Sequence, residues 1–110
     1  MEPINIIVIN PEKREIYATK CEPTPEAYYA LIGNGCDMIE GLYTPQLRSA
    51  EPPHIGYVDE EGCLKPNYIF HIPPHIKRVC GTAIILGCNE DGEDIDCTLK
   101  IEYIKYLVQW

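Results

Sequence analysis

The chain is short of basic residues, and this shortage excludes several classes of function. Its 110 residues include 9 Lys and Arg against 17 Asp and Glu, so the formal net charge is −8. Phosphate contacts need clustered Lys and Arg, so we expect no direct nucleic-acid binding. The same balance disfavours an anionic membrane surface. It permits an acidic surface that docks on a basic groove of another protein.

Long apolar stretches and a leader are also missing. The longest apolar run covers residues 79–88, which is too short to cross a bilayer, since a spanning helix takes about 20 residues. Residues 1–5 lack the basic and apolar regions of a signal peptide. We therefore expect a cytoplasmic protein.

Metal-binding and catalytic patterns are absent as well. Six cysteines stand at positions 21, 36, 63, 80, 88 and 97, and no pair has Cys-x-x-Cys spacing. Without a secretory context, we expect all six to be reduced thiols. His71 and His75 have prolines between them, so they do not share a helical face as metal ligands. Cys63 lies near histidines, but nothing specific activates it as a nucleophile. We expect no metal, no cofactor and no enzymatic activity.

Four segments predict strands. Residues 4–9 are rich in β-branched side chains, and Asn10-Pro11 starts a turn, so residues 14–19 are expected to complete a hairpin. The run 79–88 has β-branched residues and no helical period, which predicts a strand buried on both faces. Residues 36–43 alternate imperfectly and predict a further strand.

Helix signals occur at two places. Thr24 can cap a helix, Pro25 suits its first position, and Gly33-Asn34-Gly35 can end it. The tail 97–110 fits either a strand or a helix begun by Thr98. We favour the helix, because of the capping signal and the length of the segment.

The connections carry most of the prolines. Residues 44–53 contain three of them, which predicts a loop and a candidate binding loop. Residues 54–58 and 62–65 surround an acidic turn and predict a hairpin. Residues 66–78 contain Pro73-Pro74, so we expect an ordered connection without a central strand.

Together the elements predict one domain, 1–110, of the α+β class. We expect one mainly antiparallel sheet of five or six strands with two helices packed on one face.

Two sets of side chains are candidate binding residues. The acidic set is Asp59, Glu60, Glu61, Glu90, Asp91, Glu93, Asp94 and Asp96. If its two segments lie at the same end of the sheet, the eight carboxylates share one rim. The aromatic set is Tyr43, Tyr57, Tyr68, Phe70 and Trp110, which suit a protein interface or a stacked nucleotide base. The segments Gly33-Asn34-Gly35 and Gly87-Cys88-Asn89 offer backbone donors for a phosphate, without the full spacing of a phosphate loop.

The order of these motifs resembles the domain of unknown function 3846, a family of phages, plasmids and bacteria. The resemblance rests on Leu31-Ile32-Gly33-Asn34-Gly35, Asp37-Met38-Ile39-Glu40, the stretch from Tyr57 to Lys65, Pro73-Pro74, the stretch from Cys80 to Gly87, and the closing segment Leu99 to Leu107. The chain departs from the family in its cysteine content and in its proline loop at 44–53. No catalytic residue is carried over.

The resemblance implies a mobile-element setting in a bacterial host. There the leading hypothesis is a non-enzymatic counter-defence protein, such as an anti-CRISPR-like inhibitor of a Cas effector. A second hypothesis is a sponge, that is, a homo-oligomeric protein that binds a nucleotide signal and sequesters it. A third is a small accessory enzyme of mobile-element metabolism.

Overall fold

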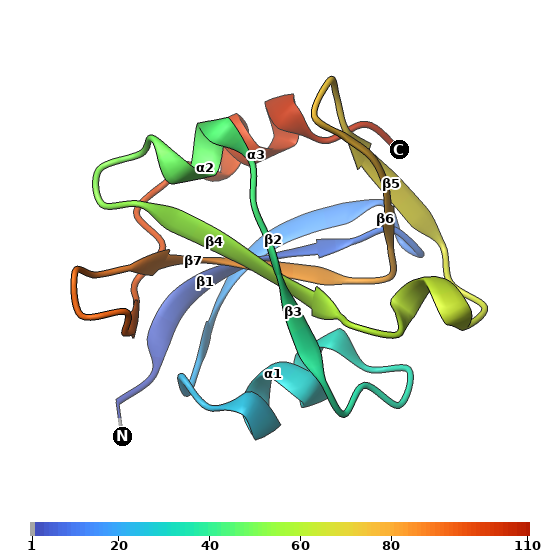
Figure 1. The fold of residues 1–110 in the computed structure, drawn as a ribbon, viewed down its shortest axis with the longest axis horizontal. Helices are drawn as coiled ribbons and strands as arrows, with labels where there is room; N and C mark the ends of the chain where they lie inside the picture. The colour runs from blue at the N-terminus through green and yellow to red at the C-terminus, as the bar shows by residue number, and fades with distance from the viewer. Residues whose placement is uncertain (1) are drawn as a thin grey trace.

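A computed structural model, which describes residues 2–110, contains two antiparallel sheets (Figure 1). The larger has the strand order β2-β1-β7-β4-β3, with β8 paired to β7. Its strands are β1 (Ile4–Asn10), β2 (Glu15–Cys21), β3 (Ile39–Leu42), β4 (His54–Asp59), β7 (Ala83–Cys88) and β8 (Asp94–Ile95). The smaller sheet pairs β5 (Ile69–Ile72) with β6 (Ile76–Cys80). The predicted α+β class and the mainly antiparallel sheet are confirmed.

The centre of the large sheet is β7, flanked by β1 and β4. Ile84 and Leu86 are buried on one face, and Ala83 and Ile85 are buried on the other. The predicted buried strand is therefore confirmed for β7, whose residues 83–87 are buried. Residues 79–80 belong to β6 instead, because the chain turns at Gly81, whose φ is +91°.

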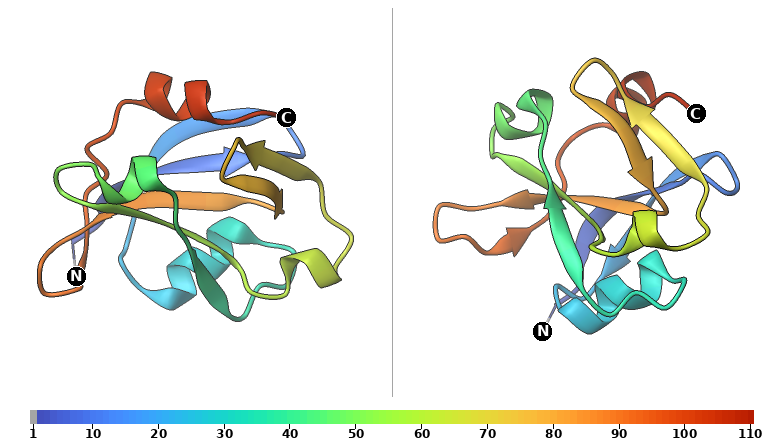
Figure 2. Two further views of the ribbon diagram at one scale, coloured as in Figure 1. Left: turned by 45° about the horizontal axis from the view of Figure 1, so that its top comes forward. Right: turned by 45° about the vertical axis from the view of Figure 1, so that its right-hand side comes forward.

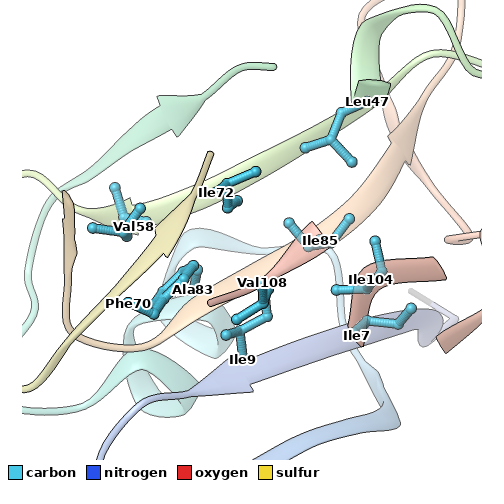
Figure 3. Packing of buried hydrophobic residues seen from close by; sticks show 11 residues of the cluster. Ile7, Ile9, Leu47, Val58, Phe70, Ile72, Ala83, Ile85, Ile104 and Val108 are labelled. Carbon is cyan, nitrogen blue, oxygen red and sulfur yellow. The ribbon is translucent and has the colours of Figure 1, made fainter. Parts of the chain in front are cut away.

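Each face of the sheet has its own cover (Figure 2). One face packs against α1 (Pro25–Ile32). The other packs against α3 (Ile101–Leu107), the short helix α2 (Pro45–Arg48) and the β5–β6 pair. Figure 3 shows this second cluster, in which Leu47, Phe70 and Ile104 meet the sheet residues. The two main helices thus lie on opposite faces, not on one, since β1 and β7 present apolar side chains both ways.

The predicted helix starts hold with one exception. The Thr24 hydroxyl accepts the Ala27 N–H at 3.3 Å, with Pro25 in the first turn. The tail is helical as expected, but α3 begins after Lys100, whose extended backbone (ψ 142°) makes it the N-cap in place of Thr98.

The predicted loop at 44–53 contains α2. The Thr44 hydroxyl accepts the Leu47 N–H at 3.1 Å, and Pro45 opens the helix. Thr44-Pro45 repeats the start signal of Thr24-Pro25, so this helix was present in the pattern and was missed. Leu47 is buried and anchors the turn to the core.

The segment from 59 to 80 differs most from expectation. No second strand follows the acidic turn at 59–61; the chain enters a 3₁₀ turn, η1 (Gly62–Leu64), while β4 pairs with β3 and β7. The supposed proline connection holds β5 and β6, with the cis Pro73–Pro74 bond in the turn between them. Pro73 and Pro74 prevent strand pairing only where they stand, in the turn, and the residues on either side of them form β5 and β6.

A disulfide joins Cys63 to Cys80, so the prediction of six reduced thiols is wrong for this pair. Cys21, Cys36, Cys88 and Cys97 are free thiols. Within residues 2–110, no helix has the length and apolarity needed to cross a membrane.

Candidate functional site

The two acidic segments of the candidate set lie at opposite ends of the large sheet. β4 and β7 are antiparallel, with His54 opposite Gly87. The end of β7, which leads into residues 90–93, therefore lies beside the start of β4. Residues 59–61 follow the far end of β4 (Figure 2). The expected single rim of eight carboxylates does not form.

The Asp59 side chain makes its contacts within the protein. It is only 5% exposed, and its carboxylate accepts hydrogen bonds from Lys65 Nζ at 2.7 Å and from the Glu61 N–H at 2.9 Å. These bonds hold the turn that follows β4. A partner has access to Glu60 and Glu61, which are exposed, but not to Asp59.

Asp94 is also committed to internal contacts. It accepts the hydroxyl of Tyr28 at 2.7 Å and that of Tyr57 at 2.9 Å. The two rings are 5.3 Å apart between centroids. Burial, together with the Asp94 carboxylate, raises the pKa of both tyrosines, so both remain neutral donors at physiological pH. These partly buried contacts tie α1 and β4 to β8.

Tyr28 is a hydrogen-bond partner of Asp94 that sequence reasoning missed. It lies on the apolar stripe of α1 and was assigned only to packing. The stripe gave no sign that its hydroxyl needs an acceptor; the one available signal was that a buried tyrosine usually finds a hydrogen-bond partner.

Asp96 pins the start of β1, because its carboxylate accepts the Asn5 N–H at 2.7 Å. The Asn5 carbonyl in turn accepts the Cys97 N–H at 2.7 Å. These two bonds join the start of β1 to the two residues that follow β8. Asp96 therefore has a structural role within the chain that does not require a partner protein.

The turn after β7 carries three further carboxylates of the candidate set that face solvent. Asn89 organises it, since its side-chain oxygen accepts the N–H groups of Asp91 at 3.0 Å and Glu93 at 2.9 Å. Its amide donates to the Glu93 carboxylate at 3.2 Å. Gly92 has a φ of +80°, which closes the turn. Glu90, Asp91 and Glu93 are all exposed on it.

Strand register places further acids at the same end of the sheet. Ile4 pairs with Cys21, so residues before β1 and after β2 lie there, as do residues before β4. We define the acidic end as the exposed residues Glu2, Glu22, Glu51, Glu90, Asp91 and Glu93. Cations on the elements at this end include Lys20 in β2 and Arg48 in α2, whose guanidinium lies 5.3 Å from the Tyr43 ring centroid.

The aromatic candidates do not form one surface. Tyr43 and Tyr68 are exposed but border different cavities. Phe70 is fully buried in the core, and Trp110 packs edge-on against it at 6.4 Å between centroids. Tyr57 belongs to the Asp94 unit. Exposed aromatics that the sequence did not single out include Tyr103 and Tyr106 of α3.

His54 is structural. It is 2% exposed; its Nδ1 is 2.7 Å from the Pro52 carbonyl, and its Nε2 accepts the Thr98 N–H at 3.0 Å. Burial lowers the pKa of His54, which fits a neutral ring that donates from Nδ1. The ring joins the start of β4 to the segment before α3.

Residues 2–110 show neither an activated thiol nucleophile nor a group of side chains placed to bind a metal ion. Cys63 is in a disulfide and is not a free nucleophile. Burial raises the pKa of the Cys21, Cys36 and Cys97 thiols, which keeps them protonated. Over the same residues, no three His, Cys, Asp or Glu side chains are placed to hold a metal ion.

No family model, no curated protein and no solved structure matches this chain. The resemblance to the domain of unknown function 3846 therefore stays a prediction from the sequence motifs.

Proposed function

We propose that this protein is a non-enzymatic binding protein that docks on a basic groove of a partner through the acidic end. The observation that carries this proposal is the gathering of six exposed carboxylates at one end of the sheet. An overall charge of −8 reinforces the local potential. Such a surface steers a positively charged partner and confers specificity more than raw affinity.

The order of the turn after β7 supports this role. The Asn89 side chain makes three hydrogen bonds within the turn, so Glu90, Asp91 and Glu93 project from a fixed backbone. A preorganised turn loses less conformational freedom on docking than a flexible one. Its carboxylates therefore suit recognition of a fixed set of Arg and Lys side chains.

The family resemblance suggests the identity of the partner. In a mobile-element setting within the bacterial cytoplasm, the basic groove is that of a host defence nuclease such as a Cas effector. The acidic end then competes with nucleic-acid phosphates for the same cations. Because exposed charges are screened by salt, this inhibition weakens as ionic strength rises.

Charge reversal tests the proposal. Glu90→Lys, Asp91→Lys and Glu93→Lys, combined in one variant, should abolish co-elution with a Cas effector at low salt and relieve inhibition of DNA cleavage. We expect binding to weaken at least about tenfold.

A matched control carries three reversals away from the acidic end, at Glu15, Glu60 and Glu61, which are also exposed. It undergoes the same change in net charge and should keep inhibition. Retained inhibition in the acidic-end variant would refute the proposal. So would equal losses in both variants, which would indicate a nonspecific charge effect. Failure of the wild type to bind any Cas effector would remove the proposed partner.

A further inference from the structure

A cavity lies at the end of the sheet opposite the acidic end. Its volume is about 390 Å³, within the usual range of about 300–1,000 Å³ for small-molecule sites. It is bordered by the β1–β2 turn, the end of α1, residues 66–68 and the turn at 81–82. The site is therefore independent of the surface assigned to protein docking.

Hydrogen bonds fix one wall of this cavity. The Asn34 amide donates to Asn67 Oδ1 at 3.0 Å and to the Pro66 carbonyl at 3.3 Å. The Asn67 amide donates to the Gly62 carbonyl at 2.8 Å. A Cβ at Gly81 would lie 3.2 Å from Asn67 Oδ1, so the bare backbone there gives Asn67 its room. The amide groups are thus positioned before any ligand arrives.

Other polar groups of the lining have no protein partner within the described residues. Asn10 Oδ1 accepts the N–H groups of Glu12 at 3.0 Å and Lys13 at 3.3 Å, which leaves the Asn10 amide unused. The Asn34 side-chain oxygen and the Thr82 hydroxyl are likewise available. The cavity therefore offers both donors and acceptors, from three separate segments of the chain.

The charge of the lining decides against an anionic ligand. Among the described residues, no Lys or Arg lines the cavity, and the one charged side chain in the lining is the carboxylate of Glu12. This disfavours the phosphate that was considered for residues 33–35. At the mouth, Tyr68 is 61% exposed. Its ring offers an apolar face without an added charge.

We propose that this cavity binds a neutral sugar. Sugar hydroxyls both donate and accept, so they match the available amide, carbonyl oxygen, hydroxyl and carboxylate of Asn10, Asn34, Thr82 and Glu12. Because these groups come from three separate segments of the chain, they suit a ligand with several polar groups around its rim. A nucleobase presents its polar atoms only along its edges. Tyr68 stacks on the apolar face of the sugar ring.

Titration of the full chain with glucose, galactose, mannose and N-acetylglucosamine tests the site. In ¹H–¹⁵N spectra, the side-chain amide signals of Asn10, Asn34 and Asn67 should shift saturably with at least one sugar. Tyr68→Ala should weaken that sugar about tenfold, since it removes the stacking surface. Thr82→Val should weaken it several-fold without a change of volume. Neither variant should alter the spectrum of the rest of the chain.

Tyr106→Ala is the matched control, since this α3 tyrosine is 83% exposed and lies outside the cavity lining. It should leave sugar binding unchanged. No saturable shift with any of the four sugars would overturn the proposal, as would equal weakening by Tyr68→Ala and Tyr106→Ala. Saturation of the same signals by adenosine or AMP but by none of the sugars would overturn the ligand class.

Discussion

Replacement of Cys63 and Cys80 by alanine should lower the free energy of unfolding by about 3 kcal/mol. The two cysteines are 17 residues apart, and a disulfide that closes a loop of this length stabilises mainly by restricting the unfolded chain, by roughly 3 kcal/mol. The loop encloses β5 and most of β6. Phe70, Ile72 and Val79 of these strands are buried in the core, so the loop should stay folded without the bond.

Urea unfolding at neutral pH, followed by circular dichroism and by Trp110 fluorescence, measures this loss. Cys63→Ala, Cys80→Ala and the double variant should be destabilised nearly equally, because each of them removes the same bond. The dependence of the unfolding free energy on urea should become steeper, since the unfolded chain is less restricted. Cys88→Ala, at a half-buried free thiol, is the control and should cost below about 1 kcal/mol.

A loss below about 1 kcal/mol in the double variant would refute the loop-entropy argument, as would additive losses in the single variants. The expected loss also bears on the proposed cytoplasmic setting, where thiols are kept reduced. Domain stabilities run from about 5 to 15 kcal/mol. A reduced form about 3 kcal/mol less stable is therefore expected to remain folded there.

Three other contacts give predictions that urea unfolding can check. Tyr57→Phe removes a hydrogen bond to Asp94 and should cost about 1–3 kcal/mol at neutral pH. Burial raises the pKa of Tyr57, so the contribution of Tyr57 to stability is complete below about pH 10 and is lost as the pH rises further; an equal alkaline loss in Tyr57→Phe would contradict this. Burial lowers the pKa of His54, so its contribution is complete above about pH 6.5 and falls at lower pH. The acid loss should be smaller in His54→Gln, and identical pH profiles would count against the buried neutral ring. Ile84→Ala should cost about 2–5 kcal/mol, because it leaves a cavity in the central strand, whereas Tyr106→Ala should change stability by less than about 0.5 kcal/mol.

Local signals in the sequence identified those elements whose causes are local. The β-branched run predicted β7, and the Thr24 cap with Pro25 predicted α1. The same reasoning failed at Pro73-Pro74, where prolines were taken to exclude strands throughout 66–78. In fact they occupy the turn of a hairpin, and the strands on either side contain no proline.

The contacts that were missed depend on residues distant in sequence. The Cys63–Cys80 bond forms because η1 lies beside the end of β6, and no cysteine spacing reports that approach. Likewise, β7 inserts between β1 and β4. Because β7 runs antiparallel to β4, the acidic turn after β7 and the one after β4 lie at opposite ends of the sheet. Strand order, which local patterns do not encode, thus decides which carboxylates are neighbours.

The carboxylates of the acidic candidate set fall into two groups with different consequences for mutation. Asp94 accepts two tyrosine hydroxyls, whereas Glu90 is exposed on the turn after β7. Neutralising Asp94 leaves two partly buried tyrosine hydroxyls without their acceptor, so any loss of partner binding would accompany a loss of stability. Neutralising Glu90 should leave stability unchanged. A binding defect without a stability defect is therefore the signature that assigns a carboxylate to the acidic end, and the net charge of the chain cannot make that distinction.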